Sequence, residues 1–421
     1  MVRTMKAQAT NKYDVIVVGG GAAGLMAAAH AAERGRKVLI LEKNRRVGEK
    51  LVITGGGRCN ITNATYDAHA LLAKYGESAQ ALYSPYSQFG VEGTFSFFEK
   101  LGLPIEVEAN NRAFPKSRKA ADVRKVLASY LDEKGVKVAV GIAVTKVETE
   151  GNRITTVTAG GEKFSADTFV FATGGVSHPE TGSTGDGFHW LKKLGHSIVT
   201  PTPGIVPIRT LESWIKKLAG KALPNAKITF FVEGAKKFSK TGRILCTHFG
   251  LSGPLILNSA EEIGDLLHIG TVTATIDLFP TEDQGILERR LLSVFDQNKN
   301  KNLRTVLKDL VPSGTNDTLL ELLAGTLDGE KKVHSITVAE RKALARTLKT
   351  LPVTVTGLMG FDRAVVADGG VPLAEIDTRT MRSRIMANLY IIGDLLDISR
   401  PSGGYSLQLC WTTGYVAGEN A

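Results

Sequence analysis

Residues 13–42 read YDVIVVGGGAAGLMAAAHAAERGRKVLILE, and this stretch decides the fold. Its β-branched start, Tyr13 to Val18, predicts a strand that ends at three consecutive glycines. Residues 22–34 then have helical composition, Gly35 closes the helix, and residues 37–41 form a second apolar strand. Together these segments complete a right-handed βαβ unit, which belongs to a parallel sheet.

The glycines of this turn have the spacing of a dinucleotide-binding site. Gly19, Gly21 and Gly24 satisfy GxGxxG directly after a strand and at the start of a helix. Glu42 ends the second strand about twenty residues later, where a carboxylate can accept hydrogen bonds from both hydroxyls of an adenosine ribose. Because that charge repels a 2′-phosphate, the bound dinucleotide is expected to be FAD or NAD rather than NADP.

The C-terminal part of the chain decides between FAD and NAD. Residues 388–392 (NLYII) predict a buried strand that ends in Gly393 and Asp394, and a helix is expected to begin near Ser406. Flavoproteins use a Gly-Asp strand end of this kind to bind the ribityl chain and the pyrophosphate, whereas a nicotinamide dehydrogenase does not need this second binding point. We therefore expect one sheet, built from both ends of the chain, to hold FAD.

Between these ends the composition changes three times. We expect a first part of the FAD-binding domain over residues 1–190, a β-rich domain over 191–282, a helical subdomain over 283–350, and a return to the FAD-binding domain over 351–421. The glycine-rich residues 48–63 predict a loop without a stable helix. Helices are expected at 94–103 and 118–134, and strands at 136–140, 143–148, 153–158, 163–164 and 169–172.

Composition limits the class of protein and its partners. The 421 residues carry a net charge of +10, which suits an anionic partner, but the basic residues are spread along the chain, so nucleic acid is not the expected partner. The three cysteines form no CxxC pair, which argues against a zinc site or a disulfide framework and fits a reducing cytoplasm. If residues 13–42 fold as described, the N-terminal apolar run is neither an export signal nor a membrane span, and residues up to about Asn11 form a loose leader.

Five blocks of sequence resemble one flavoprotein family. They are TGGGRCNITN at 54–63, FATGG at 171–175, TGSTGDG at 181–187, THFGLSGP at 247–254 and GDLLDISRPSGGYSLQ at 393–408. In this order they resemble the BaiN-like, YhiN-type family of NAD(P)/FAD-dependent, aminoacetone-oxidase-like oxidoreductases. The resemblance implies an α/β fold in which a split Rossmann-like FAD-binding domain carries inserted β-barrel-like and helical domains.

The resemblance also implies cofactor contacts, residue by residue. Together with the glycine motif and the strand ends, the expected cofactor-binding residues are Gly19, Gly21, Ala23, Gly24, Glu42, Lys43, Gly56, Gly57, Arg58, Cys59, Asn60, Val144, Thr173, Gly174, Gly393, Asp394, Gly404, Tyr405, Ser406 and Leu407. Val144 would act through its backbone on the adenine. The sequence departs from the family pattern at Ser406, where Asn is more usual, and in the segment Arg400-Pro401-Ser402.

The reaction expected is a two-electron transfer at the flavin on a small-molecule substrate. Since a second GxGxxG unit is missing from the sequence, either NAD(P)H docks transiently and a double bond is reduced, or an amine reduces the flavin and oxygen reoxidises it. His248 is the candidate for proton exchange, against the alternative of a structural histidine, and Arg58 has the alternative of pairing with a local carboxylate. The competing functions are an RNA-modifying flavoprotein that binds tRNA and a flavin scaffold without turnover.

Overall fold

The structure, a computed structural model, describes residues 11–421, and the chain divides into two compact units. Of the described residues, the first unit comprises 11–204 and 365–421, and the second comprises 205–364. Both boundaries lie later in the chain than the expected 190/191 and 350/351, because β10 (Val199–Pro203) and β17 (Ala367–Gly370) pair with each other inside the first unit. The expected leader up to about Asn11 falls almost wholly outside the described residues.

The βαβ unit forms as the sequence predicts. Strand β1 (Asn11–Val18) leads into helix α1 (Ala22–Glu33), and strand β2 (Val38–Glu42) pairs parallel to β1 with Val15 opposite Val38. All of β2 is buried, and so are nine residues of α1, which explains why both read as apolar runs. Gly35 takes φ +78°, the left-handed conformation that ends a helix.

A mixed sheet, built from both ends of the chain and parallel at its centre, is the core of the first unit. Its order is β18-β19-β20-β9-β1-β2-β6, and β9 (Glu162–Phe171) lies between β1 and the late strand β20 (Leu389–Ile391), parallel to both. The remaining strands of this sheet are β6 (Lys137–Val140), β7 (Val144–Glu150), β8 (Arg153–Ala159), β18 (Ile376–Asp377) and β19 (Arg382–Ser383). The expected strands 163–164 and 169–172 are thus parts of the single strand β9.

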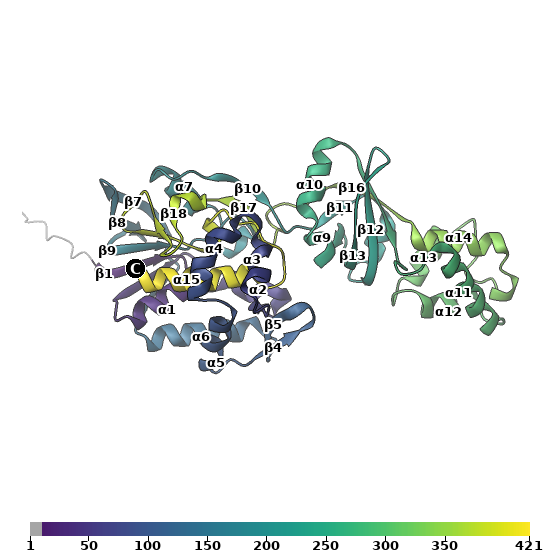
Figure 1. The fold of residues 1–421 in the computed structure, drawn as a ribbon, viewed down its shortest axis with the longest axis horizontal. Helices are drawn as coiled ribbons and strands as arrows, with labels where there is room; N and C mark the ends of the chain where they lie inside the picture. The colour runs from purple at the N-terminus through teal and green to yellow at the C-terminus, as the bar shows by residue number, and fades with distance from the viewer. Residues whose placement is uncertain (1–10) are drawn as a thin grey trace, which may run out of the picture. The chain divides into compact units, whose positions relative to one another are not determined.

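The C-terminal helix α15 (Tyr405–Asn420) packs along α1, and the two helices lie side by side in Figure 1. Their backbones approach closely at two glycines of α15: a Cβ on Gly414 would lie 2.5 Å from the carbonyl oxygen of Ala23, and one on Gly418 would lie 2.6 Å from that of Ala27. Only glycine permits this contact, and it seats the end of the chain against the first helix.

Other helices and short strands of the first unit surround this sheet. The expected helices at 94–103 and 118–134 are confirmed as α5 (Val91–Lys100) and α6 (Ala120–Glu133). The unit also contains α3 (Ala68–Leu72), α4 (Ala79–Gln88), α7 (Asp186–Lys193), and a small sheet of β3 (Thr62–Asn63), β4 (Ile105–Glu108) and β5 (Arg112–Pro115).

One secondary-structure prediction is wrong. The loop expected over 48–63 contains helix α2 (Glu49–Gly57), although Thr54, Gly55 and Gly56 leave helical dihedral angles. The reason is that the segment EKLVI before the glycines has enough helix-forming residues for one turn, and the glycines then end it.

The second unit is a closed antiparallel barrel with α-helices inserted between its strands, four of them before the last strand. The barrel order is β11-β14-β13-β12-β15-β16, which confirms the expected barrel. Its strands are β11 (Ile208–Thr210), β12 (Ala222–Val232), β13 (Ala235–Cys246), β14 (Gly250–Ser252), β15 (Val272–Asp277) and β16 (Leu351–Leu358). The helices are α8 (Ser213–Lys217), α9 (Pro254–Leu257), α10 (Ala260–Ile269), α11 (Gln284–Gln297), α12 (Leu303–Leu310), α13 (Asn316–Leu322) and α14 (Val338–Lys349).

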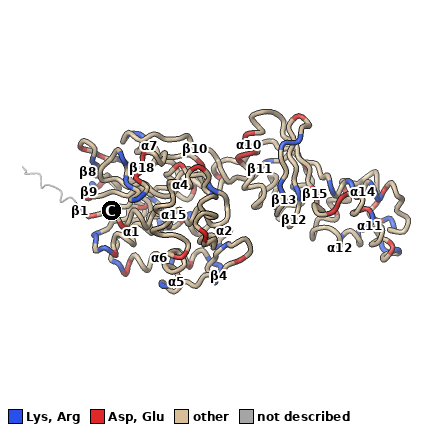
Figure 2. The backbone as a smooth tube through the Cα atoms, in the orientation of Figure 1, with Lys and Arg blue, Asp and Glu red and all other residues tan. Residues whose placement is uncertain are grey.

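The distribution of charged residues and the hydropathy of the helices were compared with the predictions. Figure 2 shows Lys and Arg interspersed with Asp and Glu in both of them, as the spread of basic residues in the sequence predicts. None of the helices in residues 11–421 combines the length and the apolar character that crossing a lipid bilayer requires.

Candidate functional site

A pocket opens where four parallel strands of the first unit end. It is lined by residues at or just after these ends, namely Val18, Glu42, Ala172 and Ile392, and its empty space is about 1190 Å³ when the part open to solvent is included. In open α/β sheets, ligands bind outside the carboxyl ends of the strands. Because β20 pairs parallel to β9, residues more than 370 positions apart, such as Gly19 and Gly393, line one cavity. We call it the cofactor pocket.

The three motif glycines have three different surroundings. Gly19 takes φ +105°, and a Cβ there would lie 2.4 Å from the carbonyl oxygen of Ala172. At Gly24 a Cβ would lie 2.0 Å from the carbonyl oxygen of Gly19, whereas at Gly21 it would meet nothing within 4 Å. The first glycine therefore serves the turn, the third serves close packing, and the second leaves open space for a ligand.

The N-terminus of α1 supplies the charge that a pyrophosphate needs. Its N-cap residue, Gly21, makes no side-chain cap, and its first turn contains no acid. The positive end of its dipole and the first N–H groups, at Gly21 and Ala22, therefore face the pocket, which Ala23 also lines. A pyrophosphate fits this donor set, and a Cβ at Gly21 would occupy the space that the open position leaves for it.

Glu42 is held rigidly at the end of β2. Its carboxylate is 6% exposed and accepts hydrogen bonds from the backbone N–H groups of Gly20 and Asn44, both at 2.7 Å. A carboxylate has about four acceptor sites, so two remain for the ribose hydroxyls that the sequence predicts as its ligands. The two amide donors fix the position of the acid before any ribose arrives.

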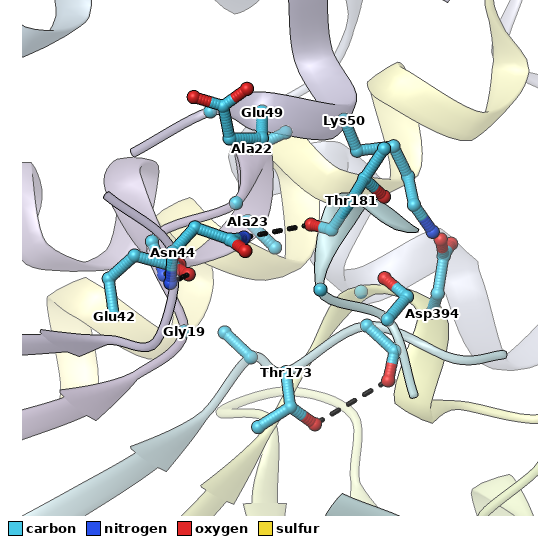
Figure 3. Close-up of a pocket in the computed structure, with 18 of the residues that line it drawn as sticks. Gly19, Ala22, Ala23, Glu42, Asn44, Glu49, Lys50, Thr173, Thr181 and Asp394 are labelled. Atoms are coloured by element: carbon cyan, nitrogen blue, oxygen red, sulfur yellow. Dashed lines mark hydrogen bonds between the residues drawn. The ribbon is translucent and has the colours of Figure 1, made fainter. Parts of the chain in front are cut away.

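The loop TGSTGDG is brought to the same end of the pocket. Asn44 donates a hydrogen bond from Nδ2 to the carbonyl oxygen of Thr181 at 2.9 Å, and Lys43 pairs with Asp186 at 2.8 Å. Figure 3 shows the Asn44 contact beside Glu42. These bonds tie residues 181–186 to the end of β2, and Thr181, Gly182, Ser183 and Asp186 all line the pocket. Sequence reasoning noted this loop but did not assign it to the cofactor.

Asp394 and the start of α15 form the other end of the pocket. Gly393 takes φ +65°, and a Cβ there would lie 3.0 Å from the Cβ of Ala23, so the return strand ends directly against α1. Helix α15 begins after Gly404 without a side-chain cap from the described residues, so free N–H groups lie at Ser406 and Leu407, which both line the pocket. Figure 3 shows Asp394 and Lys50 at the side of the pocket opposite Glu42 and Asn44.

The structure brings together twelve of the residues that the sequence nominates for the cofactor. The pocket is lined by Gly19, Gly21, Ala23, Glu42, Lys43, Val144, Thr173, Gly174, Gly393, Asp394, Ser406 and Leu407. The nominated residues of the first unit that lie outside this lining are Gly24, Gly56, Gly57, Arg58, Cys59, Asn60, Gly404 and Tyr405.

Two of the residues outside the lining have partners of their own. Arg58 donates to both carboxylate oxygens of Glu108, at 2.9 and 3.1 Å, and its guanidinium lies 4.1 Å from the ring centroid of Phe114. This is the local ion pair that the sequence left open as the alternative. Cys59 is fully buried, and burial raises the pKa of its thiol to about 12, so the thiol stays protonated at neutral pH.

His248 lies in the second unit, exposed in the turn between β13 and β14. Its role in proton exchange stays a prediction. The pocket residue that the sequence analysis missed most clearly is Lys50, which follows Gly48 at the start of α2 and whose side chain lines the cavity. The sequence could have indicated this residue, because Lys50 is the basic residue that comes shortly before the glycine-rich TGGG block at 54–57.

Comparison with known proteins places this geometry in context. A family model described as the HI0933-like protein Rossmann domain matches residues 13–420. The chain is 30% identical over 408 residues to the 3-dehydro-bile acid delta(4,6)-reductase of Clostridium scindens, which covers 96% of this chain and 98% of that protein. It is 27% identical over 414 residues to the ribosomal RNA dihydrouridine synthase of Escherichia coli, with 97% and 98% covered.

Solved structures share the fold. The 3-ketosteroid-delta4-(5alpha)-dehydrogenase of Rhodococcus jostii RHA1 superimposes with a TM-score of 0.54, covers 99% of this chain and 98% of that chain, and is 15% identical.

Proposed function

The chain belongs to the HI0933-like Rossmann-domain family and is an FAD-dependent oxidoreductase, and we propose that it reduces a carbon–carbon double bond conjugated to a carbonyl group. One observation carries the proposal: relatives similar over nearly the whole chain are named for this same chemistry. A delta(4,6)-reductase of a 3-dehydro-bile acid and a dihydrouridine synthase both add two hydrogens across a double bond. In each substrate a carbonyl group is conjugated with that bond and accepts the charge that develops.

Different residues of the pocket would bind different parts of FAD. The N–H groups at Gly21 and Ala22 would bind the pyrophosphate, and Glu42 would orient the adenosine ribose. Asp394 would bind the ribityl chain, and the N–H groups at the start of α15 would lie toward the ring system. FAD, when bound, supplies the two-electron chemistry, and the protein positions it and excludes water. Apolar side chains such as Trp190, Val366 and Leu407 line the cavity and serve that exclusion.

The substrate class proposed is a small unsaturated ketone. The test uses the holoenzyme without oxygen: NADH or NADPH is added until the yellow flavin absorbance is lost, and an acceptor is then mixed in. A steroid with a double bond conjugated to its ketone should restore the absorbance and appear as the saturated ketone in mass spectrometry. The saturated ketone itself is the matched control and should leave the flavin reduced. The proposal fails if amines bleach the flavin and unsaturated ketones never reoxidise it.

A second candidate substrate is a uridine in ribosomal RNA. It is favoured by two relatives named ribosomal RNA dihydrouridine synthase, 27% and 26% identical over most of this chain, and by the net charge of +10. In the same assay, an rRNA fragment should then reoxidise the flavin, and its affinity should fall steeply with salt. Reoxidation by RNA without reoxidation by any small ketone would select this candidate.

A cytoplasmic location is also part of the proposal. Support comes from Cys59, Cys246 and Cys410, which are all free and buried, as expected for a protein in a reducing compartment.

A further inference from the structure

Three charged side chains, Lys50, Asp394 and Arg400, gather at the side of the cofactor pocket opposite Glu42. Arg400, whose side chain is completely buried, forms an ion pair with Asp394. The same guanidinium donates to the carbonyl oxygen of Ile398 at 2.6 Å and to Ser406 Oγ at 3.2 Å. The segment that departs from the family pattern thus joins Asp394 to Ser406, and both of these residues line the pocket.

Lys50 approaches the same carboxylate from another element. It extends from α2 into the pocket, donates a hydrogen bond from Nζ to the buried Ser177 Oγ at 3.1 Å, and points toward Asp394 in Figure 3. Burial lowers the pKa of Lys50, and the attraction of Asp394 opposes that effect. Asp394 is therefore the main group that supports a positive charge on the half-buried Lys50.

The charges around Lys50 do not cancel. Asp394 is a single carboxylate shared by two cations, and Arg400 already forms the direct ion pair with it. Cys410 also faces Lys50, but burial raises the pKa of its thiol to about 12, so it is neutral. Glu180 faces Lys50 as well, but its side chain is 60% exposed and is hydrogen bonded to His178, so solvent screens its charge.

An excess cation is useful where negative charge develops. A hydride carries two electrons and one proton, so its transfer from a nicotinamide donor to FAD leaves one additional negative charge on the flavin. A fixed positive charge in a site of low dielectric constant stabilises that charge without reorganisation. The position of Lys50 agrees with this role: Lys50 and Asp394 lie in Figure 3 on the side of the pocket opposite Glu42, the residue proposed to bind the adenosine ribose.

We propose that Lys50 and Arg400, arranged about Asp394, stabilise the negative charge of reduced FAD and thereby raise the reduction potential of the bound cofactor. The inference depends on FAD binding and not on the substrate, so it stands even if the proposed unsaturated ketone is wrong.

The test measures the affinity of the apoprotein for oxidised and for reduced FAD, and takes the ratio of the two dissociation constants. Lys50→Gln should weaken reduced FAD relative to oxidised FAD about tenfold, which for a two-electron couple corresponds to a potential about 30 mV lower. Lys50→Arg keeps the charge and should restore the ratio. Asp394→Asn removes the negative charge and should change the ratio in the opposite direction. Arg46→Gln, on the exposed part of the same loop, is the matched control.

Two results would overturn the proposal. If Lys50→Gln weakens both redox forms equally, Lys50 binds a part of FAD that does not change on reduction. If Lys50→Gln and Asp394→Asn shift the ratio in the same direction, charge is not the cause. Because the ratio is measured with added FAD, a variant purified without the cofactor is still informative, and Asp394→Asn decides the question if Lys50→Gln does not fold.

Discussion

Two alanine substitutions in the glycine motif should have opposite effects on fold and on cofactor. At Gly24 a Cβ would lie 2.0 Å from the carbonyl oxygen of Gly19 and 3.2 Å from the Cβ of Ala172, so a backbone atom would have to move. At Gly21 a Cβ would meet nothing within 4 Å, and φ is −79°, which any residue adopts. Gly24→Ala should therefore damage the fold, and Gly21→Ala should leave it almost intact.

The magnitudes follow from these contacts. Overpacking costs about 3 kcal/mol when backbone must shift, and the better helix propensity of Ala returns about 1 kcal/mol, so Gly24→Ala should lower the free energy of unfolding by about 2 kcal/mol. For a unit of this size that loss corresponds to about 4–8 °C in Tm. Gly21→Ala changes only the helix N-cap, which costs less than about 1 kcal/mol. Its methyl group occupies the open space beside the α1 amides, and FAD affinity should fall at least tenfold, about 1.4 kcal/mol.

The assay is thermal unfolding of both apoproteins by circular dichroism, followed by FAD titration with flavin fluorescence. Gly35→Ala, at a left-handed turn position away from the pocket, is the control for a glycine effect unrelated to the cofactor. Its φ of +78° should make it lose stability and keep FAD affinity. Two results would refute the assignment of the open position to the pyrophosphate. In one, the Gly21→Ala apoprotein is as unstable as the Gly24→Ala apoprotein. In the other, Gly21→Ala binds FAD as tightly as the unmodified protein.

Three further predictions concern charged and thiol groups. Glu42→Ala removes the acceptor of two backbone amides, so it should lower the free energy of unfolding by about 1–3 kcal/mol and also weaken FAD binding. Urea unfolding and FAD titration measure these two effects, and Asn44→Ala should show smaller ones. Cys59 and Cys410 should resist alkylation at pH 8 in the native protein and react in urea, since burial raises the pKa of each to about 12; rapid native labelling in mass spectrometry would contradict this. The folded-state pKa of Lys50 is lowered, so between that pKa and about 10.4 the unfolded chain binds more protons than the folded chain. The stability of the apoprotein should therefore rise with pH in that window, and Lys50→Met should flatten the rise.

The sequence pattern predicted the elements whose apolar periodicity and terminating glycines match their burial in the structure. The strand ending at Gly19, the helix closed by Gly35 and the buried strand NLYII were all predicted, and the structure confirms them. The wrong prediction, a loop in place of α2, arose because the glycines at 55–57 outweighed the helix formers that precede them. The five residues EKLVI are enough for one helical turn before those glycines end it.

The sequence by itself determined the βαβ unit, the order of the glycines and the acid that follows them, because each is a local steric or electrostatic requirement of a dinucleotide site. It also pointed to Gly393 and Asp394, which line the same pocket as the glycine motif. Only the tertiary structure decided which residues face the cavity: it turned Arg58 toward Glu108, and it brought Lys50 and Arg400 to Asp394 from separate elements. The physical reason is that a side chain's electrostatic partner is set by which strands pair and which helices pack, and these contacts join residues hundreds of positions apart.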